Sequence, residues 1–435
     1  LIGFVVNGFA QADGEYYLYD ANDEQFLSRG AAWGTEASVD KYGIPFYWNS
    51  TEGSIKFKDN GLYLFNPDTN GGTSLFTDNQ STGFRFVETE GGYYLQDVNT
   101  NGYATFSAGD LGLYVHLTSE VESAVVWQFK TKAERDEIVA GYVNQNYENV
   151  IKAAGLSISA EEFITTISKG RMIDMTSAIG TARFSGNVDN WLYTEVRGQG
   201  GQPAYGNDFC ELWQATGKHT QTITGLKSGI YKVTVNGFER AAGWAKCNEL
   251  AAEGYEIVTS SFHANLEQTA LKSWYSGKSG DSNPNNTGEA VAKFNEGNYQ
   301  NELYVYVEED GLLELAVDKR SHVGDNWILF NNFTLTYFDF SPLEVANIAE
   351  LSSLEAGTIV KLALNDAKVT LWSGAGQSMA TYVEDATGAI TFDMGLSNAF
   401  ETIKSNVALN GYIYAEYKKD WNGMPTLSVT AETEK

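Results

Sequence analysis

The fold of the middle of this 435-residue chain is indicated by the segment Gly229-Ile230-Tyr231-Lys232-Val233-Thr234-Val235-Asn236-Gly237-Phe238. From Tyr231 onward, apolar side chains alternate with polar ones, which is the period of a strand with one buried and one solvated face. We predict further strands of this kind over residues 220–223, 303–307, 312–317 and 327–337. The sequence therefore predicts a mainly β domain, a jelly-roll β-sandwich, over residues 171–340.

Two short connections and one insertion interrupt these strands. Residues 225–229 and 308–311 combine glycine with polar residues, which is typical of hairpins. Residues 239–287 show no strand alternation. There we predict a helix over residues 241–253 and a polar surface loop over residues 276–287.

The first 130 residues contain a repeated aromatic pattern. The repeats are Tyr16-Tyr17-Leu18-Tyr19-Asp20, Leu62-Tyr63-Leu64-Phe65-Asn66 and Tyr93-Tyr94-Leu95-Gln96-Asp97. Each is followed by a second short strand and closed by an aromatic strand, at residues 46–48, 84–86 and 126–129. Three four-stranded units of about 40 residues predict a β-trefoil-like domain over residues 13–130. Chance repetition among many aromatic residues is the alternative.

The rest of the chain divides into two parts and a leader. The capping box Thr131-Lys132-Ala133-Glu134 opens a helix, and a second helix begins near Ser159, so residues 131–170 are predicted to be a short helical connector. Residues 341–435 are predicted to form an OB-like small barrel with a helix over residues 397–404. Residues 1–12 are predicted to be a signal-peptide remnant ending at Ala10-Gln11-Ala12, with an ordinary first strand as the alternative. On the first interpretation the protein is secreted, periplasmic or on the outer cell surface.

Charge and composition narrow the choice of partners. The chain has 56 acidic and 29 basic residues, a formal net charge of −27, which repels phosphate backbones and anionic lipids. Nucleic acid is therefore excluded as a main partner. No run of 18 apolar residues occurs, so no membrane-spanning segment is predicted. Cys210 and Cys247 are the only cysteines, and they form either one disulfide bond or two free thiols.

Several segments resemble a known group of proteins. The segment Trp327-Ile328-Leu329-Phe330-Asn331-Asn332-Phe333-Thr334-Leu335-Thr336-Tyr337 resembles the last strand of galactose-binding-like jelly rolls from secreted Bacteroidetes proteins, which ends W-x-x-F-[DN]-N-F-x-L-x-Y. Residues 209–214, 221–226, 229–235, 292–299 and 310–315 resemble the same modules in the same order. Residues 16–38 resemble a segment that precedes ricin-lectin-like trefoil repeats, and residues 341–435 resemble OB-like domains of the same group. The resemblance implies carbohydrate binding without catalysis. The sugar-binding residues of the lectin repeats find no match here, so for that region it implies only the fold.

Motifs for catalysis and metal binding are lacking in the sequence. The histidines His116, His219, His263 and His322 form no i, i+4 pair, although His219 and His263 could meet in the sandwich. The sequence has no G-x-S-x-G and no D-x-D-x-D-G loop. Gly277-Lys278-Ser279 resembles the end of a phosphate-binding loop, but Lys272 occupies the place of its first glycine. We predict no enzyme activity, no metal site and no cofactor, with a structural Ca²⁺ in the jelly roll left open.

The remaining candidates for function are aromatic. Sugars pack their C–H faces on Trp and Tyr rings and bond to polar side chains. The predicted ligand-binding residues are in or beside the 239–287 insertion: Trp244, Trp274, Tyr275, Arg240 and Asn265. The alternative for these rings is a satellite core that covers the sandwich edge. Trp213 and Trp327 lie within predicted strands and are predicted to be core residues, whereas Trp33, Tyr42 and Trp421 are open either way.

We predict that this exported surface protein binds a polysaccharide or other glycan through aromatic loop residues of the jelly roll, with the trefoil-like region as a further candidate. The alternatives are a structural or protein-adhesion scaffold with protein partners at the cell surface, and an accessory region of a larger glycoside hydrolase.

Overall fold

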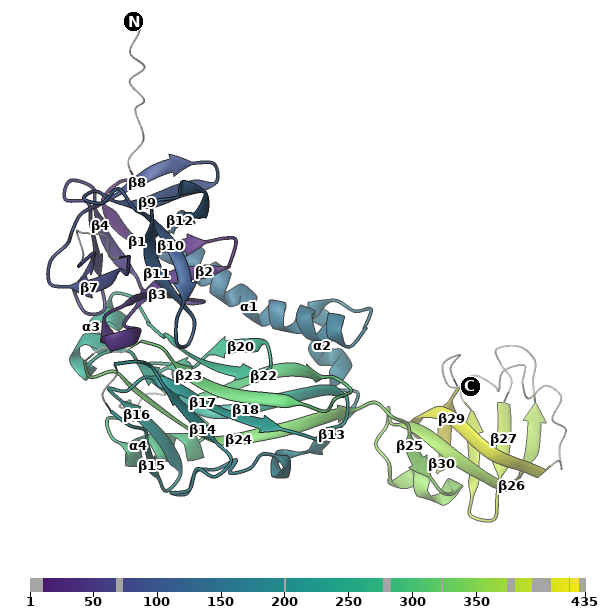
Figure 1. Cartoon of the computed structure of the whole chain (residues 1–435). Coiled ribbons are helices and arrows are strands. Elements are labelled where there is room, and N and C mark those ends of the chain that lie inside the picture. The colour runs from purple at the N-terminus through teal and green to yellow at the C-terminus, as the bar shows by residue number, and fades with distance from the viewer. Residues whose placement is uncertain are drawn as a thin grey trace, which may run out of the picture. The chain divides into compact units, whose positions relative to one another are not determined.

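The computed structural model describes residues 11–67, 73–198, 201–276, 283–321, 324–373, 380–392, 408–421 and 423–429. The chain is mainly β and divides into two compact units (Figure 1). The first comprises residues 1–161 and 174–337, and the second comprises residues 162–173 and 338–435. The predicted signal remnant lies almost wholly outside the described residues, as do His322, the segment 277–279 and the predicted helix over 397–404.

The described part of residues 11–130 forms twelve short strands and two 3₁₀ turns. In chain order they are β1 (Gly14–Asp20), β2 (Gln25–Arg29), η1 (Ala32–Gly34), β3 (Ala37–Asp40), β4 (Phe46–Asn49), β5 (Ser54–Phe57), β6 (Tyr63–Phe65), β7 (Phe76–Asp78), β8 (Phe84–Thr89), β9 (Gly92–Asp97), β10 (Tyr103–Ala108), β11 (Leu113–Thr118), η2 (Val121–Ser123) and β12 (Val126–Lys130). Pairing of β12 with β1 closes a ring of seven strands. The strands surround one core, in which Leu18, Leu64 and Leu95 of the three repeated segments are fully buried.

The connectivity repeats three times in this region. The hairpins β2–β3, β6–β7 and β10–β11 meet one another through main-chain bonds. Ala37 N–H donates to Leu75 O (2.8 Å), and Leu75 N–H donates to Val115 O (3.0 Å). The predicted phase of the second repeat is wrong, because its segment forms β6, a hairpin strand, whereas the first and third form β1 and β9. An apolar residue between aromatic ones suits both kinds of strand, so the pattern alone does not distinguish them.

Two helices follow the first region, as the sequence predicts. The first is α1 (Lys132–Ala153), and Thr131 and Glu134 form its capping box. It ends just before Gly155, which adopts a positive φ of 65°. The second is α2 (Ala160–Ile167). Figure 1 shows α1 running along the first unit, where it contacts β1 and β12 on one side and β20 and β22 on the other.

The middle of the chain forms two sheets that pack face to face. Its elements are β13 (Arg171–Asp174), η3 (Thr176–Ala178), β14 (Leu192–Glu195), β15 (Ala204–Gly206), β16 (Phe209–Trp213), β17 (Gly217–Ile223), β18 (Gly229–Arg240), α3 (Trp244–Ala252), β19 (Ser260–Ala264), β20 (Glu267–Ala270), β21 (Lys272–Ser273), α4 (Thr287–Asn295), β22 (Gln300–Val307), β23 (Leu313–Lys319) and β24 (Trp327–Asp339). One sheet has the order β15-β16-β24-β18-β21, with β22 also beside β18 and β13 beside β24, and the other has the order β14-β17-β23-β19-β20. Tyr231, Val233 and Val235 of β18 point into the shared core, as their alternation predicts.

Both predicted hairpins are wrong. Strand β17 pairs with β23 rather than β18, and β22 pairs with β18 rather than β23, so residues 225–229 and 308–311 each cross from one sheet to the other. The two crossings pack together: Leu226 N–H donates to Gly311 O (3.1 Å). A Cβ atom on Gly311, whose φ is 67°, would lie 2.6 Å from Leu226 O. Glycine is needed here for a close approach of two backbones, and its signal is the same as that of a hairpin.

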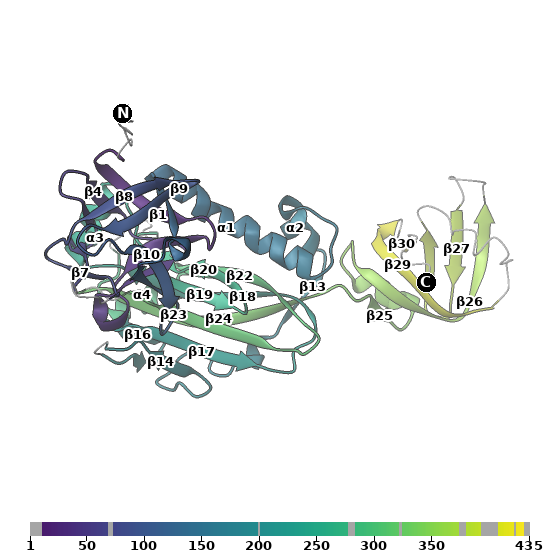
Figure 2. The ribbon, with the colours of Figure 1, turned by 45° about the horizontal axis from the view of Figure 1, so that its top comes forward.

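The prediction that residues 239–287 form no strands is wrong, because β19 and β20 belong to the smaller sheet and β21 pairs with β18. The helices before and after these strands, α3 and α4, cover the outer face of the larger sheet. A second cluster forms there, with Phe238, Trp274 and Trp327 at its centre and Phe294 of α4 over it. Helix α3 uses its other side: Leu250 belongs to the core of the N-terminal region, together with Tyr255 and Ile257 that follow. Figures 1 and 2 both show α3 beside the N-terminal strands. The insertion thus attaches the two-sheet region to the N-terminal strands.

The second unit contains a small closed barrel. Its described elements are β25 (Leu343–Val345), η4 (Ile348–Ser353), β26 (Ile359–Ser373), β27 (Ala380–Glu384), β28 (Ala389–Phe392), β29 (Ala408–Trp421) and β30 (Met424–Ser428). Five strands follow the order β26-β27-β28-β30-β29 and close by pairing of β29 with β26. Val360, Leu362, Val383 and Ile390 are among the residues that fill its core.

Candidate functional site

A cross-strand row at the end of the larger sheet brings one predicted site residue, Arg240, together with two tryptophans that are predicted to be core residues. Trp213 of β16 lies opposite Trp327 of β24, and Trp327 lies opposite Arg240 of β18. The Arg240 guanidinium carbon lies 5.4 Å from the centre of the Trp213 ring and 5.1 Å from that of Trp327. Both distances suit cation–π contact. The row is on the outer face of the sheet, away from the main core.

The three side chains differ in exposure. Trp327 is 2% exposed, as predicted for a core residue, and its indole N–H donates to Glu211 Oε1 (2.7 Å). Trp213 is 42% exposed, so its prediction as a core residue is wrong. It is the last residue of β16, and nothing in the cluster under α4 covers it. An exposed tryptophan therefore lies at the sheet end beside a buried arginine.

Arg240 is held firmly under this surface. Its Nη1 donates to Asn285 Oδ1 (2.7 Å), and its Nη2 lies 3.5 Å from Asp325 O. Its side chain is buried, and this burial lowers the pKa of the guanidinium. Burial also raises the pKa of Glu211. The hydrogen bond from Trp327 acts in the opposite direction, but its effect on the pKa is smaller. The fixed cation holds one face of Trp213 in place.

Polar groups and a second tryptophan border this surface. Gln214 Nε2 donates to Asp325 Oδ1 (3.0 Å), and Asp325 is exposed. Gly243 lies against the same carboxylate, because a Cβ atom there would be 3.2 Å from Asp325 Oδ2. The next residue, Trp244, begins α3 and is 54% exposed. We call Trp213, Gln214, Arg240, Trp244 and Asp325 the sheet-end platform.

Three predicted site residues lie elsewhere. Trp274 is 2% exposed and its indole N–H donates to Pro284 O (2.7 Å), so the prediction that it contacts sugar is wrong. Tyr275 is half-buried against the Trp274 ring. Asn265 forms the β19–β20 turn of the other sheet with a φ of 54°, where it accepts from Glu314 N–H (2.8 Å). The satellite-core alternative therefore holds for Trp274, which belongs to the cluster that α4 covers. The sequence alone does not show that α4 packs there.

The aromatic candidates outside the two-sheet region are also placed. Trp33 is half-exposed at a positive φ of 57°, and the Arg197 guanidinium lies 4.7 Å from its ring centre. Tyr42 is buried. The side chain of Trp421 is outside the described residues. Trp33 therefore stays a candidate, with one ring face covered by arginine.

Two buried ionisable side chains, Lys319 and Glu239, hold the strand ends next to the platform. Lys319 is fully buried, and its Nζ donates to Leu212 O (3.3 Å) and Asn326 Oδ1 (2.8 Å). These acceptors immediately precede Trp213 and Trp327. Glu239 precedes Arg240 and accepts from the N–H groups of Thr259 (2.6 Å) and Ser260 (2.7 Å). Burial lowers the pKa of Lys319 and raises that of Glu239. The pair fixes the strand ends that carry the platform.

The two cysteines and the metal candidates give no reactive centre in the described part of the chain. Cys210 lies in the main core and Cys247 in the cluster under α3, and both are free thiols. Burial raises the pKa of each thiol. Within the described ranges, no three His, Cys, Asp or Glu side chains are grouped to hold a metal ion.

The two histidines of the smaller sheet, His219 and His263, do not meet. His219 lies opposite Val317 and His263 lies opposite Ala316, so they face opposite sides of the smaller sheet. His219 Nε2 bonds to the Tyr205 hydroxyl (2.9 Å) inside the core. Burial lowers the pKa of His219 to about 3 and that of His263 to about 4.

These two histidines predict a loss of stability in acid. Both stay neutral in the folded chain while the unfolded chain takes up protons below about pH 6.5. Each therefore removes about 1.4 kcal/mol of unfolding free energy per pH unit between that value and its folded pKa. The variant His219→Gln should lose about 2 kcal/mol less than the unmodified chain between pH 6.5 and 4.5, measured by urea denaturation. His116→Gln, at a histidine outside these sheets, is the control. Equal acid losses in all three proteins would contradict the prediction.

Comparisons with known proteins do not assign the chain to a family. No protein family and no curated protein matches the chain. A solved structure titled "Structure of PNGF-II in C2 space group" aligns with 84% of this chain and 80% of its own, at 10% identity and a TM-score of 0.15. A likeness this weak bears on neither fold nor function. Among the described residues, no helix combines the length and apolar character needed to cross a membrane.

Proposed function

We propose that this chain is a non-catalytic glycan-binding protein and that the sheet-end platform contacts the glycan. The observation that carries the proposal is Trp213, which is 42% exposed and backed by the buried guanidinium of Arg240. Trp244 supplies a second exposed ring, and the residue before it, Gly243, lies against the Asp325 carboxylate. Rings of this kind stack on the C–H faces of sugars, and amide and carboxylate groups bond to sugar hydroxyls.

We also propose the finer fold assignments. The threefold pattern of twelve strands supports a β-trefoil for the N-terminal region. Two packed, mainly antiparallel sheets with crossings between them support a galactose-binding-like jelly roll. The closed five-stranded barrel supports an OB fold. Together with the signal-like residues 1–12, this composition supports a role at the outer cell surface or in the secreted fraction.

The charge of the chain selects among glycans. A net charge of −27 repels sulfated and uronate-rich polymers at low ionic strength. Neutral polysaccharides carry no such penalty, and their contact with aromatic rings depends little on salt. The proposed ligand is therefore a neutral polysaccharide.

Affinity electrophoresis in gels containing a neutral polysaccharide tests the platform. Trp213→Ala and Trp244→Ala should each weaken retardation at least about tenfold, because each removes a central aromatic contact. Tyr412→Ala removes an exposed ring of the second unit and should leave retardation unchanged. Retardation that survives the loss of both tryptophans would place binding elsewhere. Release of new reducing ends from the polymer would contradict the non-catalytic assignment.

A further inference from the structure

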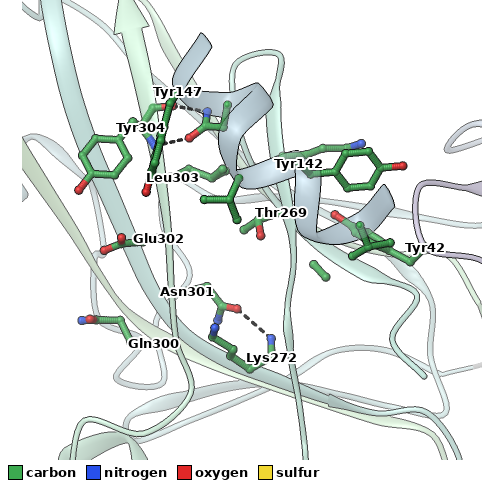
Figure 3. Close-up of a pocket in the computed structure, with 15 residues that line it drawn as sticks. Tyr42, Tyr142, Tyr147, Thr269, Lys272, Gln300, Asn301, Glu302, Leu303 and Tyr304 are labelled. Carbon is green, nitrogen blue, oxygen red and sulfur yellow. Dashed lines mark hydrogen bonds between the residues drawn. The ribbon is translucent and has the colours of Figure 1, made fainter. Parts of the chain in front are cut away.

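A cavity of about 360 Å³ lies between α1 and the neighbouring strands β20 and β22 (Figure 3). One wall is α1, through Val139, Tyr142, Val143 and Tyr147. The other wall consists of β20, β22 and the intervening Lys272. Its volume lies within the range of roughly 300–1,000 Å³ that small-molecule sites occupy.

The cavity exists because α1 is tied to its surroundings by a few polar contacts rather than by a packed face. Only Asn146, Val150 and Ile151 of its residues are buried. Arg135 Nε donates to Tyr42 O (2.8 Å) and the Tyr142 hydroxyl donates to Lys41 O (3.1 Å). Asn146 then bridges to β22, donating to Tyr304 O (2.8 Å) and accepting from Tyr304 N–H (3.2 Å). Between these anchors the helix spans a gap that no side chain fills.

Tyrosine rings bound the cavity at both ends. Tyr147 and Tyr304 form an edge-to-face pair with ring centres 5.6 Å apart, and Tyr42 and Tyr142 form another at 6.3 Å. Figure 3 shows one pair at each end. Tyr142 and Tyr147 are the half-buried members of these pairs, so their rings are the ones that can contact the C–H face of a ligand.

An amide, a carboxylate and an ammonium group line the opening of the cavity. Gln300 and Glu302 project from the same side of β22 (Figure 3), and Lys272 lies at the neighbouring strand. All three side chains are exposed, and the described residues give their side chains no hydrogen bond or ion pair. Carboxylate accepts, ammonium donates and amide does both, so together they match hydroxyls that each donate and accept. By contrast, Asn301 Nδ2 already donates to main-chain oxygens, those of Val235, Gly237 and Tyr299.

We propose that this cavity is a second saccharide site, of the pocket type, that takes one or two neutral sugar units. The proposal stands on the cavity's own tyrosines and free polar groups, so it does not depend on the sheet-end platform. The platform is an open surface suited to the length of a polymer, whereas the cavity is enclosed on two sides and suited to a short sugar or a chain end.

The test uses saturation-transfer NMR on the full chain with glucose, galactose, mannose, maltose, cellobiose and lactose. At least one of these sugars should bind. Val143→Trp, at an exposed position of α1 that lines the cavity, should abolish its signal by filling the space. Asn144→Trp places the same ring on the adjacent exposed residue, which does not line the cavity, and should leave binding intact. Glu302→Gln should weaken binding several-fold through the loss of a charged acceptor.

Other outcomes separate this site from the platform. Binding that survives Val143→Trp, or no signal from any of the six sugars at about 10 mM, would overturn the proposal. Loss of the signal in Trp213→Ala would assign the sugar to the platform and would also overturn it. If only the platform proposal is wrong, Trp213→Ala will leave the polysaccharide retardation unchanged, and the NMR signal of the small sugar will still be present.

Discussion

Replacing Arg29 with methionine should lower the free energy of unfolding by about 3–5 kcal/mol. Arg29 is one of the largest fully buried side chains, and it forms a two-pronged ion pair with the equally buried Asp59. Its Nε donates to Asp59 Oδ1 (3.1 Å), while Nη2 contacts the other carboxylate oxygen. Removing the cation leaves a carboxylate buried in the N-terminal core without its partner, and water cannot reach it.

Urea denaturation of the full chain measures this effect. Arg85→Met, at an exposed arginine of the same region that bonds to Gln96 and Asn101, is the matched control and should change stability by less than about 1 kcal/mol. Arg29→Met combined with Asp59→Leu should recover most of the loss, because no charge is then left buried. A loss below about 1 kcal/mol in Arg29→Met would show that the pair contributes little.

The second large effect is expected at Lys319, beneath the platform. Lys319→Met removes the donor to Leu212 O and Asn326 Oδ1 and the electrostatic attraction of the lysine for the buried Glu239. The expected loss of stability is about 2–4 kcal/mol, because two buried acceptors lose their donor and a buried carboxylate loses an attracting charge. Because the two acceptors precede Trp213 and Trp327, the variant should also weaken polysaccharide retardation.

A double-mutant cycle assigns this loss to the charge. Glu239→Gln in the Lys319→Met background should restore at least half of the lost stability, because glutamine is neutral and still accepts from Thr259 and Ser260. Additive losses in the double variant would mean that Glu239 and Lys319 do not interact, and the effect would then come from the broken bonds to Leu212 and Asn326.

Local patterns in the sequence predict much of the secondary structure. Thr131 and Glu134 mark the start of α1 because both partners of a capping box lie within four residues of each other. The alternation of Tyr231, Val233 and Val235 gives the buried face of β18 in the same way. The same segment also contains a change of phase: its apolar residues have odd numbers from Tyr231 to Val235, and the next one, Phe238, has an even number. The structure has a register shift at this place, between Thr234 and Asn236.

Relations between distant segments are less accessible to sequence. Residues 225–229 have hairpin composition, yet the residues that pair with β17 lie 90–102 positions away in the chain and those of β22 that pair with β18 lie 64–78 positions away. The platform shows the same limit. Trp213 and Trp327 are both strand residues, and they differ only because the cluster under α4 covers one and not the other. Trp213 is the last residue of its strand, and the backbone of the next residue, Gln214, turns away with a positive φ of 51° that no feature of the sequence indicates.

A glycan array probed with the full chain tests whether this acidic β protein binds neutral glycans. We expect retention on one or more neutral glycans, with little change between about 50 and 500 mM NaCl, because ring stacking is not screened by salt. Binding to none of the neutral glycans, or binding only to anionic glycans at high salt, would contradict it.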